Sequence, residues 1–311
     1  MGVLKKLNKK RYLVSLFTIA IVATLIVWRP YVLIQGVQRG GLYALIALPM
    51  ALILGIVGII NLAHGEFMML GAYFVYWICV YTGLDPLVAM IVAFVAFFLV
   101  GAIVYMVTIK HVLKAPELNQ LLLTFGIAMV LSEFANLLWT SQARKLHLSY
   151  VYSSASVGHL TFGTFGFIYP IAAIVVLIGL LLFLRYTRTG QAALAVGQNP
   201  RGAKLVGIDV NRTYLLIFSL SIAIVAAVGA LFLTRHSLFP AVGSPYTMKS
   251  FCLIAMAGIG NLTGILWVGL GLGVAEALVL SFRGYGGWAD VVFFALLVAV
   301  IMFKSYRRKI A

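Results

Sequence analysis

The sequence predicts an all-α polytopic membrane protein. Hydrophobic residues make up 63% of its 311 residues and charged residues only 10%, whereas soluble domains carry about 25% charged residues. Apolar runs of about 17 to 25 residues recur along the chain, and runs of this length can cross a bilayer as helices. The strands of a membrane barrel would instead alternate over about 10 residues, so the expected spans are helical.

Ten apolar segments divide the chain. From them we predict eight full transmembrane helices plus a short re-entrant or half helix, or nine to ten helices if the segments are counted differently. The segment 249–259 is too short to span, so it is the expected re-entrant helix. The first segment is long for a cleaved signal peptide, which favours an uncleaved span. The segments are 12–28, 40–60, 66–82, 87–109, 119–139, 167–185, 213–234, 249–259, 264–281 and 288–303.

The basic residues predict that both termini are cytoplasmic. The chain has a formal net charge of +16, and its bases gather at the ends of the apolar segments. With both termini inside, 16 of the 23 Lys and Arg residues lie on the cytoplasmic side, as the positive-inside rule requires. Because the bases follow the membrane boundaries, nucleic-acid binding is not expected.

Two connections are long enough to have a function of their own. The outer one, 140–166, alternates apolar and polar residues around 146–152, which predicts a small β-hairpin. It is either a solvated connector or a docking surface for an outer partner. Neither connection forms a soluble domain, so residues 1–311 are predicted to form one membrane domain.

The inner connection, 186–212, is predicted to form two short helices joined by a turn. Asn199 and Pro200 are a helix-start signal, and Gly207 stands where a helix C-cap belongs. Its alanines favour close contact with another protein over insertion into lipid, for which bulky apolar residues would be expected. The candidate contact residues are Gly190, Ala192, Ala195, Asn199, Pro200, Ala203 and Gly207.

Two glycine-interrupted segments are the candidate substrate path. "GIINLAHG" at 58–65 is echoed 200 residues later by "GIGNLTG" at 258–264. Paired interruptions in the two halves of a transporter indicate the path, because broken backbone at membrane depth must be buried in protein or line a cavity. The candidate path residues are Asn61, His64, Gly65, Glu66, Gly258, Gly260, Asn261, Thr263 and Gly264.

Individual roles can be assigned within these segments. We expect His64 to bond a backbone carbonyl freed near the break, and Glu66 to begin the next helix, where a negative charge suits the helix dipole. Glu133 and Asp290 are expected to be paired inside the bundle or to lie at the interface with water. For Glu276 a structural role and a role in the path remain equally open.

The motifs of several enzyme classes do not occur in this sequence. There is no "GxxxxGK[ST]" loop to bind ATP phosphates, and His64 and Glu66 do not have the spacing of an "HExxH" zinc site. We therefore predict no catalytic residue, no metal site and no cofactor bound by this chain. The energy for transport must come from a partner or from a gradient.

Four separated stretches carry a family resemblance. They are "NLAHGEFMMLGAY" at 61–73, "LLLTFGIAMVLSE" at 121–133, "TRTGQAALAVGQNPRGAKLVGIDVNR" at 187–212 and "AGIGNLTGILWVGLGLGVAEAL" at 257–278. In this order they resemble the permease subunits of branched-chain amino acid ABC importers, on the LivH side of the LivH/LivM pair.

This resemblance implies a multi-pass permease of the bacterial inner membrane, and not an enzyme. It implies a second, LivM-like permease, two cytoplasmic subunits that hydrolyse ATP, and a periplasmic substrate-binding protein. It further implies that 186–212 is the loop that engages the ATPase. Related permeases carry urea, short amides or other amino acids, so the cargo remains open. The rival from another class is an ATP-independent channel or secondary carrier.

Overall fold

The computed structural model describes residues 29–158, 160–282 and 286–310. The predicted span 12–28 lies outside the described residues. The elements in chain order are α2 (Pro30–Ile56), α3 (His64–Thr82), α4 (Pro86–Val104), π-helix η1 (Tyr105–Ile109), α5 (Lys110–Val112), α6 (Glu117–Trp139), 3-10 helix η2 (Ser149–Tyr152), β1 (Ser154–Val157), β2 (Leu160–Gly163), 3-10 helix η3 (Phe165–Phe167), α7 (Ile168–Tyr186), α8 (Arg188–Gln198), α9 (Pro200–Leu205), α10 (Val210–Arg235), α11 (Gly243–Ala257), α12 (Leu262–Leu280) and α13 (Trp288–Ile310).

The polytopic helical class is confirmed. Within the described residues, six helical stretches are long and apolar enough to cross a membrane. The total of eight full spans, the re-entrant character of 249–259 and the cytoplasmic termini stay predictions. The six stretches are Pro30–Ile56, Pro86–Val112, Glu117–Trp139, Phe165–Tyr186, Val210–Arg235 and Leu262–Leu280.

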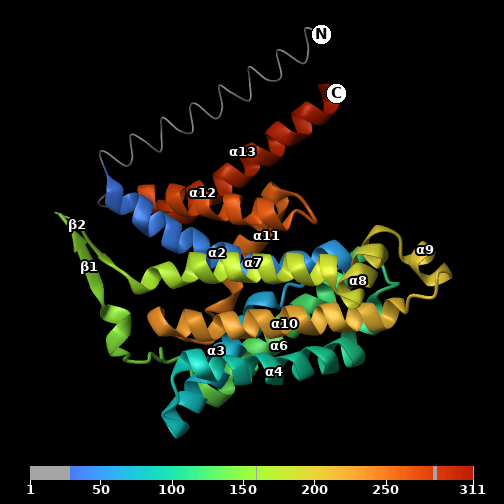
Figure 1. Ribbon diagram of the computed structural model, residues 1–311, viewed down its shortest axis with the longest axis horizontal. Helices are drawn as coiled ribbons and strands as arrows, with labels where there is room; N and C mark the ends of the chain where they lie inside the picture. The colour runs from blue at the N-terminus through green and yellow to red at the C-terminus, as the bar shows by residue number, and fades with distance from the viewer. Residues whose placement is uncertain (1–28, 159, 283–285, 311) are drawn as a thin grey trace.

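Two helices form the centre of the bundle. α2 packs against α12 and α7, while α10 packs against α4 and α3 (Figure 1). In the most apolar stretch of α2, 83% of the residues are buried, against 72% for α10 and 11% for α6. α6 therefore leaves most of its apolar surface to lipid or to a partner. The β-hairpin marks one end of the bundle and the α8–α9 pair the other.

Glycines bring α2 and α12 into backbone contact. Gly36 and Gly40 on α2 face Gly269 and Gly273 on α12, so each helix carries a G-x-x-x-G pair. A Cβ on Gly40 would overlap the backbone of Gly269, and one on Gly273 would overlap that of Gly36 and Gly40. Small residues allow this approach, which membrane helices use because water does not drive their association.

α2 begins ten residues earlier than the predicted segment 40–60. Pro30 occupies its first position, where a missing N–H costs nothing. The polar residues Gln35, Gln38 and Arg39 made the stretch before Gly40 resemble a loop. They belong to the helix and line a cavity between helices at the hairpin end of the bundle.

The predicted hairpin exists, but its position is corrected. β1 and β2 pair antiparallel between 154 and 163, whereas the predicted stretch around 146–152 holds the 3-10 helix η2. Tyr150 in η2 donates a hydrogen bond to Oδ2 of Asp85 at 2.7 Å. Burial, together with this bond and the Asp85 charge, raises the pKa of Tyr150 well above its usual value. This contact holds the loop against the start of α4.

Candidate translocation site

The two glycine-interrupted segments have the same architecture. α2 ends at Ile56 and α3 begins at His64, with Gly58 between them at φ +77°. α11 ends at Ala257 and α12 begins at Leu262, with Gly258 at φ +97°. Only glycine adopts such angles without strain. The sequence echo therefore corresponds to two helix breaks of the same kind.

An asparagine follows each of these glycines by three residues and turns the chain into the next helix. Asn61 Oδ1 accepts a hydrogen bond from the N–H of Ala63 at 3.1 Å. Asn261 Oδ1 accepts one from the N–H of Gly264 at 3.0 Å and one from the Thr263 hydroxyl at 3.1 Å. Asn61 is buried, whereas Asn261 and Thr263 are exposed in the single chain.

The first break returns toward the middle of α2. His64, fully buried at the start of α3, bonds through Nε2 to the carbonyl oxygen of Ile46 at 2.8 Å. The expected bond from His64 to a backbone carbonyl is confirmed, but its acceptor lies inside α2 and not at the break. The helix is already irregular at this point. Pro49 has no N–H, so the carbonyl of Leu45, the residue before Ile46, lacks its helical donor.

α11 closes the first break from the other side. The N–H of Gly65 donates to Oγ1 of Thr247 at 2.7 Å, and a Cβ on Gly65 would overlap the backbone of Gly243. Glu66 lies in the first turn of α3, as predicted, and is buried. The first break is thus enclosed by α2 and α11.

Three buried polar atoms at the first break have no hydrogen-bond partner in the described part of the chain. They are Nδ2 of Asn61, Nδ1 of His64 and Oε2 of Glu66. Buried polar groups are nearly always paired, so each exception needs a reason. Three such atoms lie within the six residues from Asn61 to Glu66.

The last turn of α2 connects both breaks with α8. A Cβ on Gly55 would lie 3.5 Å from the Cα of Gly260 in the second break. A Cβ on Gly197 of α8 would lie 3.1 Å from the carbonyl oxygen of Gly55. A displacement of α8 would therefore shift the last turn of α2, and through it the backbone at the second break.

The two predicted helices of the inner connection are confirmed as α8 and α9. Thr187 caps α8 through the N–H of Gly190, and Asn199 caps α9 through the N–H of Gly202, with Pro200 first in the helix. Gly207 follows α9 at φ +85°. The two helices project at one end of the bundle (Figure 1).

Of the predicted contact residues of this pair, Asn199, Pro200 and Gly207 are exposed, but the others are not. Gly190 packs on Phe183 and Leu184, and Ala203 is buried, while Ala192 and Ala195 are half-buried. The most exposed apolar side chains of the pair are Leu205 and Val206, at 88% and 76% exposure. They were not among the predicted contact residues, although an apolar pair between a short helix and a glycine is visible in the sequence.

Comparison with known proteins identifies the family. The sequence model described as "Branched-chain amino acid transport system / permease component" matches residues 32–301. This chain belongs to that family.

The relatives agree with this assignment. The high-affinity branched-chain amino acid transport system permease protein LivH of Escherichia coli K12 is 31% identical over 283 residues, which cover 86% of this chain and 91% of the relative. BraD, the corresponding permease protein of Pseudomonas aeruginosa, is 28% identical, covering 88% and 92%. A probable LivH of Methanocaldococcus jannaschii is 27% identical, covering 85% and 87%. No solved structure gives a significant match.

A charge cluster links four helices of this permease. Lys249 Nζ lies 3.3 Å from Oε1 of Glu276 and 3.1 Å from Oδ1 of Asp290, and Arg39 Nη1 lies 3.7 Å from Glu276. The Lys249 ammonium also stands 4.7 Å from the centre of the Tyr43 ring. Asp290 is thereby paired as expected, Glu276 is buried and ion-paired, and Glu133 is exposed on α6.

Loss of Lys249 is expected to destabilise the permease. Lys249→Met leaves the buried Glu276 with only the more distant Arg39, and breaking a buried pair costs about 3 kcal/mol. The midpoint of thermal unfolding in detergent should fall, and adding Glu276→Gln should restore most of it. Asp290→Asn is the control, because Asp290 is 68% exposed and its pair is worth under about 1 kcal/mol. Equal midpoints for Lys249→Met and Asp290→Asn would contradict this assignment.

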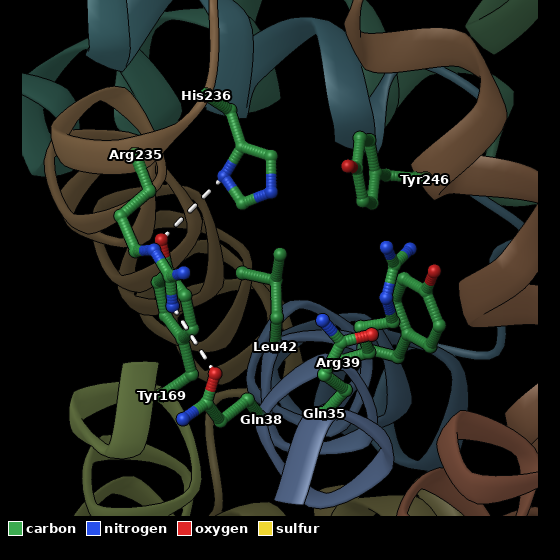
Figure 2. A pocket seen from close by; sticks show the side chains of 9 residues that line it. Gln35, Gln38, Arg39, Leu42, Tyr169, Arg235, His236 and Tyr246 are labelled. Atoms are coloured by element: carbon green, nitrogen blue, oxygen red, sulfur yellow. Dashed lines mark hydrogen bonds between the residues drawn. The ribbon is translucent and has the colours of Figure 1, made fainter. Parts of the chain in front are cut away.

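A polar cavity that the sequence did not predict lies at the hairpin end of the bundle. Its volume is about 290 Å³, and residues of α2, α7 and α11 and of the end of α10 line it. Figure 2 shows Arg235 and His236 on one side of Leu42, and Arg39 and Tyr246 on the other. Burial lowers the pKa of His236, just beyond α10, to about 4, so its ring is neutral at pH 7. The lining residues are Gln35, Gln38, Arg39, Leu42, Tyr43, Tyr169, Arg235, His236 and Tyr246.

Proposed function

We propose that this chain forms half of the translocation path of an ABC importer for branched-chain or similar small hydrophobic amino acids. The observation that carries the proposal is the meeting of the two helix breaks at the last turn of α2, where α8 also packs. Such a junction lets a partner that pushes on α8 move both breaks together. Energy would come from ATP hydrolysed on the partner subunits, since this chain has no phosphate-binding loop.

The assembly that fits this role has four further subunits or domains. We propose a second, LivM-like permease, two ATP-binding subunits docked at α8 and α9, and a substrate-binding protein at the hairpin end. The protein would lie in a bacterial inner membrane with its α8–α9 end facing the cytoplasm, in keeping with the basic residues of 186–212. Residues 1–311 would form one permease domain, with 186–212 as its coupling loop.

The polar groups of the breaks suit an amino-acid cargo. Asn61, His64 and Glu66 offer unpaired hydrogen-bonding atoms, while Asn261 and Thr263 are exposed on the second break. These groups can bond the ammonium and carboxylate of a cargo, and the aliphatic walls of the bundle tolerate its side chain. Gly258 and Gly260, where an added Cβ would meet nothing within 4 Å, leave the backbone of the second break open to such contacts, whereas Gly65 and Gly264 pack against Gly243 and Asn261.

We expect Asn61→Leu and Asn261→Leu each to lower the initial rate of leucine uptake at least tenfold. The side chains are similar in size, so the assembled importer should form in normal amounts. Uptake is measured in proteoliposomes that contain the complete importer, ATP and the binding protein. Asn261→Ser is the control, because serine keeps the helix cap and avoids its loss of about 1 kcal/mol.

The outcomes separate the alternatives. Wild-type rates in both leucine variants would refute the path assignment. Uptake that persists without the ATPase subunits would favour a channel or secondary carrier. Uptake of urea or short amides in preference to leucine would reassign the cargo within the family.

A further inference from the structure

The hairpin-end cavity contains a guanidinium without a matching anion. The ion pairs of the described residues engage Arg39 and Lys249 with Glu276 and Asp290, and none of them involves Arg235. Arg235 Nη1 instead donates a hydrogen bond to the neutral Oε1 of Gln38 at 3.3 Å. The charge of a half-buried arginine is screened less than that of an exposed one, and its guanidinium can bind a carboxylate through two parallel hydrogen bonds.

Gln38 orients this guanidinium from a fixed position. Its Nε2 donates to the carbonyl oxygen of Gly163 at 2.9 Å, at the end of β2. Gly166 leaves the room that the pair needs, since a Cβ there would overlap both Gln38 and Arg235. The hairpin, α2 and α10 thus hold Arg235 at the cavity edge, and Figure 2 shows its hydrogen bond to Gln38.

The rest of the lining suits a small amino acid. Leu42 and the rings of Tyr43, Tyr169 and Tyr246 provide an apolar wall, and the Gln35 amide provides a polar one. The volume of about 290 Å³ lies just below the range for small-molecule pockets, which begins near 300 Å³, so the cavity suits a small ligand. The positive charge of Arg39 would repel the ammonium group of an amino acid, and its ion pair with Glu276 reduces this repulsion.

We propose that this cavity binds the free amino-acid cargo on its way to the helix breaks, with Arg235 holding the α-carboxylate. This site rests on the proposed function, and it precedes the first break along α2. Ile46, which bonds His64, is three residues beyond Tyr43, about 4.5 Å along the helix axis. Tyr246 of the cavity is likewise followed directly by Thr247, which bonds Gly65.

The test is equilibrium binding of radiolabelled leucine to the complete importer in nanodiscs without its binding protein. Isovalerate, which has a carboxylate and a branched chain one carbon shorter than that of leucine but no ammonium, should compete, and isopentylamine, which has the ammonium and side chain of leucine but lacks the carboxylate, should compete at least tenfold less well. Arg235→Gln should weaken leucine binding at least tenfold and remove the preference for isovalerate. Arg235→Lys should retain part of this preference, because lysine keeps the positive charge.

Two further variants separate binding from folding. Arg29→Gln removes an arginine that lies outside the cavity and bonds Ser281, so it should leave leucine binding unchanged. Gln35→Trp fills the cavity but replaces no charged residue. It should abolish leucine binding even if the Arg235→Gln importer fails to assemble. Both are checked against the thermal stability of the wild-type importer.

The contrary results are distinct. Unchanged leucine binding in Arg235→Gln and Gln35→Trp, in an importer that takes up leucine, would refute the cavity site and leave the proposed function standing. Inorganic phosphate competing as well as isovalerate would show a general anion site and refute a cargo site. A wild-type importer that neither takes up nor binds a branched-chain amino acid would overturn both proposals.

Discussion

A permease carrying Leu205→Glu and Val206→Glu is expected to lose ATP-driven uptake while it still folds and inserts. Both side chains are exposed at the end of α9, so the substitutions remove no internal contact. If these apolar side chains are buried in a groove of the ATPase, two carboxylates placed there would be desolvated without partners, which costs several kcal/mol. The loss should appear as failure of the ATPase to co-purify with the permease.

The matched control is Gln198→Glu, which adds a negative charge to an exposed position at the end of α8. It alters the charge of the helix pair but removes no apolar surface, so uptake and co-purification should remain near wild type. Should the Leu205 and Val206 variant bind the ATPase normally and support uptake, the docking surface must lie elsewhere on the pair. Ala192 and Ala195, the half-buried residues predicted to make contact, would then be the next to test.

The helix ranges were predictable because long apolar runs have few alternatives in a bilayer. The segments 66–82, 119–139 and 167–185 agree with α3, α6 and α7 to within about two residues at each end. The capping residues were readable for a local reason, since Asn199 and Pro200 satisfy the start of α9 whatever packs around it. The same local logic placed Glu66 in the first turn of α3.

The direction in which a helix faces was not predictable from one sequence. Gln35, Gln38 and Arg39 look like loop residues when hydropathy is averaged along the chain, yet they belong to α2 and line a cavity. Their partners Arg235 and Tyr246 come from helices about 200 residues away. Only the fold brings these residues together, so the cavity had no sequence signal of its own.

The two helix breaks were predictable from the sequence for a different reason. Gly58 and Gly258 need positive φ angles, and Asn61 and Asn261 turn the chain into α3 and α12, so the geometry is written into a few adjacent residues. The acceptor of the His64 bond was missed because Ile46 becomes available only when the chain folds back along α2. The meeting of Gly55 with Gly260 is likewise a long-range contact.

Gly40→Leu should prevent formation of the folded permease. The new side chain would begin inside the backbone of Gly269 and Leu270, and a backbone cannot rotate aside as a side chain can. α2 and α12 would have to separate along their shared glycine contact, which lies beside the charge cluster of Glu276 and Lys249. Overpacking of a well-packed core commonly costs about 1–3 kcal/mol, and a clash with backbone lies at or above the upper limit.

The measurement is the yield of monodisperse permease in detergent together with its midpoint of thermal unfolding. Gly271→Leu is the control, because Gly271 lies on α12 between the two contact glycines and a Cβ there meets nothing within 4 Å. That variant should keep the wild-type yield and gain slightly in stability, since leucine is the better helix former. Gly273→Leu should behave like Gly40→Leu. If both tolerate leucine as well as Gly271 does, the close α2–α12 contact does not hold the bundle together.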